Sequence, residues 1–177
     1  MTRQRSGGDG VAALYRRPGF LIRHCHQIGV AIFIEELADF ALTPGQYGAL
    51  LLIDRHAGLD QRTLALAIGL DRSTTGAIVS RLAARGLVVR AIDPADRRGR
   101  RLWLTAAGHG MMRRAQLAAR RAQRRLLAPL PEAQRRSFVG QLVRLVLAHA
   151  DVARAPFVPL AAMADAAVDK RRRKRKS

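Results

Sequence analysis

Apolar side chains recur at helical spacing in the first part of the chain. Between Gly19 and Phe40 they occupy every third or fourth position, at Leu21, Cys25, Ile28 and Ile32. This spacing places all four on one stripe of a long helix, with Pro18 at its first turn. We expect Cys25 to be a small buried side chain of that stripe, and a redox-sensing thiol is the alternative.

A second helix is predicted from a complete start signal. The segment 42–46 (LTPGQ) supplies a threonine cap, a proline at the first helical position and a glutamine at the third. These residue types satisfy or tolerate the free N–H groups of a first helical turn. The helix should therefore run from Pro44 to about Arg55.

Two short helices with a tight turn between them follow. Asp60 caps the first, which ends at Gly69, and Asp71 caps the second, which runs to Arg85 and is closed by Gly86. A glycine between two short helices is typical of a helix-turn-helix.

The second of these short helices has two unlike faces. Helical angles turn one set toward the core: Thr75, Ile78, Val79 and Leu82. The opposite face is small and polar and consists of Ser73, Gly76, Ala77, Ser80 and Arg81. A face of this kind approaches base edges closely in the major groove of DNA. The alternative is an ordinary solvated helix face.

A basic hairpin is predicted after the fourth helix. Residues 87–90 and 101–104 form two short extended runs, and the segment between them is rich in arginine. In a winged helix such a tip lies over the minor groove, whose negative potential attracts arginine. Arg97 and Arg98 are the best candidates for these contacts, and Asp96 is expected to hold an arginine side chain.

Two long helices complete the pattern. Thr105 caps a fifth helix to about Leu130, and Pro131 begins a sixth to about Ala150. The fifth helix gathers arginines in one sector, at Arg113, Arg114, Arg120, Arg121, Arg124 and Arg125. This sector is either a solvated face or a collector of DNA phosphates or an anionic ligand. The apolar side of the sixth helix needs a partner to bury it.

Charge strengthens the case for nucleic acid. The chain carries 32 Lys+Arg against 13 Asp+Glu, a formal net charge of +19, and such a chain is steered toward polyanions. Seven cations follow one another at 170–176, so we expect a disordered tail that adds salt-sensitive DNA affinity. The alternative is a solvated extension with no specific role.

Several function classes are excluded or disfavoured by residue usage. One cysteine permits no intrachain disulfide, the five histidines are scattered, and no apolar run reaches the ~18 residues that span a bilayer. No signal-peptide pattern, paired carboxylates, nucleophile elbow or phosphate loop is found. We therefore expect a cytoplasmic protein that is not an enzyme, with no cofactor, metal or membrane partner.

Taken together and in order, these motifs resemble the MarR family, the multiple-antibiotic-resistance type of regulator. The resemblance spans about residues 18–150 and rests on the segments 42–47 (LTPGQY), 64–65 with Gly69, 71–75 (DRSTT), 81–82, 85–88 (RGLV), 93–98 and 102–108 (LWLTAAG). It implies a mainly α fold with a small β wing, a winged helix-turn-helix flanked by long dimerisation helices. The implied divisions are a flexible leader (1–17), a dimerisation helix with the second helix (18–56), the DNA-binding lobe (57–104), C-terminal dimerisation helices (105–150) and a basic extension (151–177).

The resemblance also implies a function. Family members are commonly homodimeric repressors that bind a palindromic operator in double-stranded DNA and are released by a small anionic ligand. Segments 17–23 and 58–64 look closest to a branch tied to aromatic-acid catabolism, whose effectors are aromatic acids or their CoA thioesters. A non-sequence-specific architectural nucleic-acid-binding protein is the alternative function.

The expected contact residues follow from these patterns and the resemblance. For DNA they are Arg72, Ser73, Thr74, Thr75, Ala77, Ser80, Arg81, Arg97, Arg98 and Arg100. For the ligand the resemblance suggests Arg16, Arg17, Arg23, His24 and Tyr47. Arginine forks match carboxylates and phosphates, and tyrosine adds an aromatic wall. Arg23 and His24 could equally face solvent, and Tyr47 could belong to the core.

Overall fold

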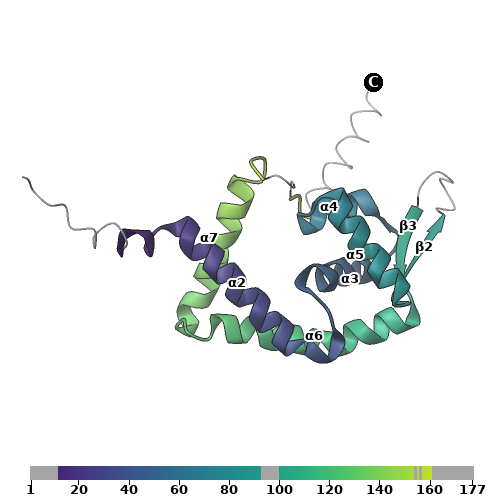
Figure 1. Ribbon diagram of the computed structural model, residues 1–177, viewed down its shortest axis with the longest axis horizontal. Helices are drawn as coiled ribbons and strands as arrows, with labels where there is room; N and C mark the ends of the chain where they lie inside the picture. Colours follow the sequence, from purple (N-terminus) through teal and green to yellow (C-terminus); the bar gives the residue numbers. More distant parts are fainter. Residues whose placement is uncertain (1–11, 93–99, 154, 156, 161–177) are drawn as a thin grey trace, which may run out of the picture.

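The structure, a computed structural model, describes residues 12–92, 100–153, 155 and 157–160. Helices dominate and a small antiparallel sheet completes the fold, which confirms the predicted mainly α architecture with a β wing. The elements are α2 (Pro18–Glu36), the 3-10 helix η1 (Ala38–Phe40), α3 (Pro44–Arg55), β1 (Leu59–Asp60), α4 (Gln61–Ile68), α5 (Arg72–Ala84), β2 (Val88–Ile92), β3 (Arg100–Leu104), α6 (Ala106–Leu127) and α7 (Glu132–Ala148). Figure 1 shows an arm formed by α2 and α7, a lobe formed by α3, α4, α5 and the strands, and α6 running along both.

Capping bonds fix the starts of the lobe's helices. The Thr43 hydroxyl accepts the Gln46 N–H at 3.3 Å, and the Gln46 side chain accepts the Thr43 N–H at 3.0 Å, which completes a capping box. The Asp60 carboxylate accepts the N–H of Thr63 at 2.9 Å. Gly69 ends α4 with φ 64°, a left-handed conformation that glycine adopts at no steric cost. The predicted bounds of α3 and α4 are confirmed.

The sheet has three strands in the order β1-β3-β2, all antiparallel. Val88 pairs with Leu104 and Ile92 with Arg100, so both hairpin strands are one or two residues longer toward the tip than predicted. The strand β1 was not predicted because two residues are too few to show alternation. Residues 93–99, which include Arg97 and Arg98, lie outside the described residues.

The core lies in the lobe and continues along α6. Its fully buried large side chains come from α3, α4, α5, the sheet and Leu37, which directly follows α2, and burying each Leu contributes about 1.5–3 kcal/mol. The four side chains of α5 that were expected to face the core are all buried, namely Thr75, Ile78, Val79 and Leu82. The small residues of α6 that let it pack closely against α2 and α3 are Ala115, Ala118, Ala119 and Ala122.

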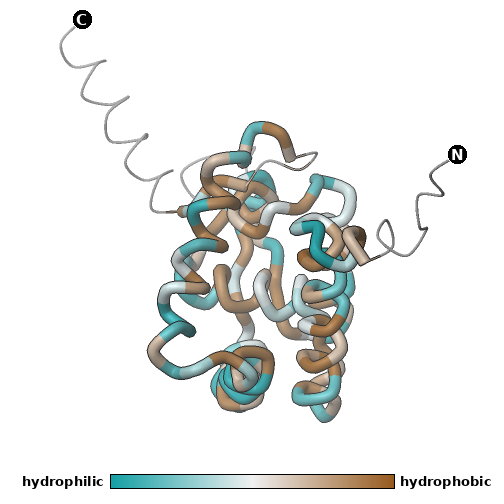
Figure 2. The backbone as a smooth tube through the Cα atoms, turned by 90° about the vertical axis from the view of Figure 1, so that its left-hand side faces the viewer, coloured by the Kyte–Doolittle hydropathy of each residue, from teal (hydrophilic) through white to brown (hydrophobic). Residues whose placement is uncertain are grey.

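The arm leaves much apolar surface uncovered within one chain. In α2 only Phe33 is buried, while Leu21 and Ile28 are half-exposed and Cys25 is exposed. The expectation of a buried Cys25 is thus wrong for the single chain, because the chain's own elements leave Cys25 uncovered and, of the stripe, Ile32 alone packs against the core. Figure 2, which views the molecule from the side of α2 and α7, shows hydrophobic stretches along its helices. The helix predicted to reach Phe40 also stops earlier, at Glu36.

A tight corner connects the wing to α6. The Thr105 N–H donates to the Leu87 carbonyl at 3.1 Å, and its hydroxyl donates to the Gly86 carbonyl at 2.6 Å. The same hydroxyl accepts the Gly108 N–H at 3.0 Å and so caps α6. These bonds fix how α6 leaves the lobe. None of the described helices is long and apolar enough to cross a membrane.

Candidate DNA interface and ligand cleft

The exposed face of α5 begins at a strong cap. The Asp71 carboxylate accepts the Thr74 N–H at 2.8 Å and the Thr74 hydroxyl at 2.7 Å. These hydrogen bonds, the backbone bond first, hold the pKa of Asp71 below its usual value. The hydroxyl of Thr74 is therefore engaged within the protein, and the turn that carries Arg72 and Ser73 is held in place.

The outward side of α5 matches the sequence prediction with one exception. Its exposed residues are Arg72, Ser73, Thr74, Ala77, Ser80 and Arg81. Thr75 is fully buried, and its hydroxyl donates to the Asp71 carbonyl at 2.8 Å. The predicted DNA contact by the Thr75 side chain is wrong, because this residue lies on the core face of the helix.

Arg90 is a basic residue of this surface that the sequence analysis missed. It lies in β2, and its guanidinium donates to the Ser80 hydroxyl at 3.0 Å and approaches the Gly76 carbonyl at 3.4 Å. The signal was present in strand alternation, because Arg90 shares a face with buried Val88, which packs toward α5. Arg100, at the start of β3, is exposed at the base of the wing. The wing thus adds cations beside the polar face of α5.

A cleft of 490 Å³ lies where α2, α3 and α6 meet. It is lined by Phe33, Pro44, Tyr47, Leu51, Gln116, Ala119, Arg120, Gln123 and Arg124. Phe33 and Tyr47 meet edge to face with their ring centroids 5.5 Å apart, which gives the cleft an aromatic wall. Burial raises the pKa of Tyr47, and the positive charges of Arg120 and Arg55 oppose that rise. The tyrosine is therefore a neutral hydrogen-bonding group.

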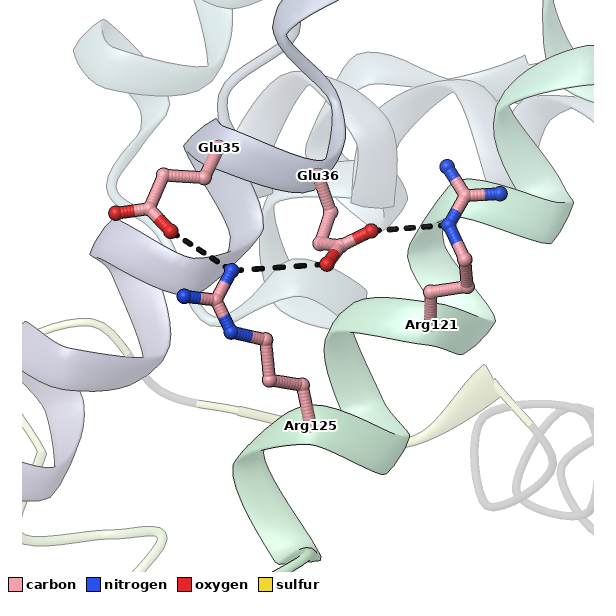
Figure 3. Close-up of polar contacts among 4 residues, drawn as sticks. All are labelled: Glu35, Glu36, Arg121 and Arg125. Atoms are coloured by element: carbon pink, nitrogen blue, oxygen red, sulfur yellow. Dashed lines mark hydrogen bonds and ion pairs between the residues drawn. The ribbon is translucent and has the colours of Figure 1, made fainter.

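The arginine sector of α6 divides into two groups. Figure 3 shows Arg121 and Arg125 reaching α2, where Arg121 Nε lies 2.9 Å from Glu36 and Arg125 Nη1 lies 2.7 Å from Glu35. Arg120 and Arg124 instead line the cleft, and neither has an ion-pair partner among the described residues. Two positive charges without local neutralisation thus stand beside an aromatic wall.

Of the five ligand residues predicted by resemblance, only Tyr47 lines this cleft. Arg16, Arg17 and Arg23 are exposed near the start of α2, where the Arg23 guanidinium lies 2.8 Å from the ring of half-buried His24. From the sequence, Arg120 and Arg124 belonged to a basic sector that was either a solvated face or a collector of DNA phosphates or an anionic ligand, and they were not named among the ligand residues. Which arginines of a helix face a cleft depends on how α6 packs against α2 and α3. No grouping of metal-ligating side chains occurs among the residues that the structure describes.

Comparison with known proteins agrees with this architecture. Residues 42–99 match the model of the MarR family. The chain is 38% identical over 104 residues to a putative transcriptional regulatory protein for the hcr operon of Thauera aromatica, a match covering 59% of this chain and 63% of that protein. The chain therefore spans less than two thirds of that relative's length.

Solved structures extend the likeness over most of the chain. PcaV from Streptomyces coelicolor, a transcriptional regulator in complex with its natural ligand, superposes with a TM-score of 0.68 at 34% identity, covering 75% of this chain and 94% of PcaV. CouR, a transcriptional repressor bound to a 23-mer DNA duplex, gives a TM-score of 0.72 at 29% identity, covering 82% and 99%. CouR from Rhodococcus jostii RHA1 bound to p-coumaroyl-CoA gives 0.66 at 29% identity, covering 82% and 97%.

These relatives are transcriptional regulators, in agreement with the prediction that the protein is not an enzyme. Family resemblance, winged helix-turn-helix fold and small polar face of α5 all lead to one assignment. The chain belongs to the MarR family of transcriptional regulators.

Proposed function

We propose that the protein is a homodimeric repressor that binds a two-fold symmetric operator and is released by an aromatic carboxylate or its CoA thioester. The observation that carries the proposal is the cleft at the junction of arm and lobe. It combines the aromatic wall of Phe33 and Tyr47 with the guanidinium groups of Arg120 and Arg124, which form no ion pair within the described part of the chain.

Dimerisation is supported by the apolar surface of the arm. Along α7 the half-exposed apolar side chains cover a broad sector, about half of the helix circumference: Phe138, Val139, Leu142, Val143, Leu145, Val146 and Leu147. Contiguous apolar surface of this kind marks an interaction site, and the commonest partner of a soluble chain is a second copy related by a two-fold axis. In such a dimer the apolar patch of each copy would cover α2 and α7 of the other copy.

DNA binding is supported by the charge and geometry of the lobe. The small side chains of α5 permit close approach to base edges, and Arg81 offers hydrogen-bond donors to guanine. Arg90 contacts Ser80 of this helix from β2, and Arg100 is an exposed cation at the base of the wing. In a two-fold dimer the two α5 helices would meet successive major grooves, about one helical turn apart.

Effector binding is supported by the chemistry of the cleft. Guanidinium groups bind carboxylates and phosphates through paired hydrogen bonds, and an aromatic wall stacks with an aromatic acid. The relatives PcaV and CouR were solved with a natural ligand and with p-coumaroyl-CoA. Because the cleft is formed by α2, α3 and α6 together, a ligand there stabilises one orientation of arm and lobe over others. Such a differential affinity shifts the equilibrium between DNA-binding and released states.

The experiment combines footprinting with a ligand screen. Purified protein is footprinted on the DNA upstream of its own gene in excess random competitor DNA, and hydroxybenzoates, hydroxycinnamates and their CoA thioesters are screened by thermal shift. A protected palindrome that an active compound releases supports the proposal. Uniform protection without a palindrome would favour the architectural alternative, and a palindrome that no compound releases would refute the effector part alone.

A further inference from the structure

Ser80 lies on the middle line of the face of α5 that we assign to DNA. Ser73, Ala77 and Ser80 are spaced by four and three residues, so they follow one another along one side of the helix. All three are exposed. Their side chains are short, so the helix can approach a base edge in the major groove closely enough for the Ser80 hydroxyl to bond to it. A hydroxyl both donates and accepts, and Ser80 alone therefore selects no particular base.

Arg90 removes this ambiguity from a second element. It belongs to β2, which lies beside α5 (Figure 1). Its Nη2 donates to Ser80 Oγ at 3.0 Å and lies 3.4 Å from the Gly76 carbonyl oxygen. The bond from Arg90 occupies one of the two lone pairs of the hydroxyl oxygen. The O–H of Ser80 donates to no group in the part of the chain that the structure describes, and it is left to meet DNA.

The acceptor that a helix usually offers to a serine is taken. A serine inside a helix commonly donates its O–H to the carbonyl four residues earlier, which for Ser80 is the Gly76 carbonyl. That carbonyl accepts the Ser80 N–H in the regular pattern of α5 and also faces Arg90 Nη2. An O–H turned toward Gly76 would bring its positive hydrogen against a guanidinium. The charge therefore favours an O–H that points away from the helix backbone.

The same charge decides which partner the hydroxyl prefers. A hydroxyl that accepts a bond from a cation becomes a stronger donor and a weaker acceptor for a second donor. A cation 3.0 Å from Oγ also attracts the negative end of an approaching dipole and repels the positive end. In the major groove guanine and thymine present acceptor atoms without an amino group, whereas adenine and cytosine carry an amino donor.

We propose that Arg90 fixes the hydrogen-bond polarity of Ser80, so that α5 selects guanine or thymine at the position that Ser80 meets. This role rests on the proposed function, the reading of an operator by α5. Its new element is that Arg90, a residue of the wing strand, is a positioning residue for a side chain of the reading helix. A cation that only bound phosphate would strengthen binding to every sequence alike.

Affinities measured base by base test this role. In both half-sites of the footprinted duplex each base pair is replaced in turn by the other three. Fluorescence anisotropy then gives Kd for the full chain, Ser80→Ala, Arg90→Met and the variant that carries both changes. Arg100→Met is the matched control: it removes another exposed cation of the wing, whereas the Ser80 hydroxyl accepts from Arg90.

The preference is the ratio of Kd values between two sequences. A uniform loss of phosphate binding cancels from this ratio, and so does a partial folding defect, which lowers the apparent affinity for all sequences equally. At one base pair of each half-site the full chain should prefer guanine or thymine by about 3- to 10-fold, the range for one hydrogen bond.

The variants should separate in this ratio. Ser80→Ala should abolish the preference, and Arg90→Met should reduce it to less than about twofold. The variant with both changes should show the same ratio as Ser80→Ala, because the two residues act on one bond. Arg100→Met should keep the full preference while it binds every sequence more weakly.

Three results would overturn the inference. One is a preference that Arg90→Met leaves unchanged, and another is a preference for adenine or cytosine at the base pair that Ser80→Ala affects. The third is an equal loss for every sequence in Ser80→Ala, which would assign its hydroxyl to a phosphate. Each of these leaves the proposed function intact as long as the full chain protects a palindrome. A full chain that protects none would refute the proposed function itself.

Discussion

Gly108 lies in the first turn of α6, at the corner where the wing passes into the long helix. A methyl group added there would overlap the Leu87 carbonyl oxygen, well inside ordinary van der Waals contact. Leu87 is buried, and its carbonyl already accepts the Thr105 N–H at 3.1 Å. The backbone therefore has to move, and that movement breaks this bond.

The cost of Gly108→Ala follows from these contacts. Loss of a buried hydrogen bond costs about 1–3 kcal/mol and overpacking a further 1–3 kcal/mol or so. The better helix propensity of alanine returns about 0.5–1 kcal/mol. We expect the free energy of unfolding to fall by about 2–5 kcal/mol.

Gly110→Ala is the matched control. It lies two residues later in the same helix, and its added methyl would meet only the ends of Arg113 and Arg114 at 3.8–3.9 Å. It should stabilise the protein by about 0.5–1 kcal/mol. Urea unfolding followed by circular dichroism at one protein concentration measures both. Equal midpoints for the two variants would refute the argument from close approach.

Three further predictions concern other parts of the molecule. Leu142→Glu should yield a monomer in analytical ultracentrifugation at a concentration where Val152→Glu remains a dimer; two dimers would contradict the assigned interface. The Arg85 guanidinium donates at 2.8 Å to both the Phe40 and the Ala41 carbonyls, so Arg85→Ala should lower the free energy of unfolding by about 1 kcal/mol in urea titrations. Arg85→Lys should lower this free energy nearly as much, because an ammonium group cannot reproduce the two parallel bonds. Asp71 has a lowered pKa in the folded state, so its carboxylate stabilises the protein above its unfolded pKa near 4 and loses this effect as pH falls through the folded pKa. Asp71→Asn should therefore reduce the change of the urea midpoint with pH between about pH 5 and 3. An unchanged pH dependence would count against the cap.

Local signals in the sequence predicted the helices of the lobe well. The caps Thr43, Asp60 and Asp71 act on N–H groups within three residues, so the sequence contains both partners of each bond. The two-residue strand β1 has no such signal, because its only specification is the pairing of Leu59 with Leu102. Its existence depends on the tertiary fold.

The parts of the site that were missed depend on packing between distant elements. Arg120 and Arg121 are neighbours in sequence, yet the first lines the cleft and the second pairs with Glu36, 85 residues away. Periodicity also identified the apolar stripe of α2 that includes Cys25, but periodicity does not show which surface packs against that stripe. The contact between Val158 and α4 shows the same limit, since one hydrogen bond from the Val158 N–H to the Leu66 carbonyl leaves no pattern in the sequence near Val158.

We propose that an anionic effector in the cleft releases the protein from DNA through Arg120. The most direct test uses the most active compound of the screen. For Arg120→Gln and for Arg114→Gln, fluorescence anisotropy measures the concentration of this compound at which half of the footprinted duplex is released. Both variants lose one charge from α6, but only Arg120 lines the cleft. A charge-assisted bond contributes about 1.5–3 kcal/mol, so Arg120→Gln should need roughly 10- to 150-fold more compound while its DNA affinity matches that of Arg114→Gln. Half-release of both variants at the same concentration would contradict the account.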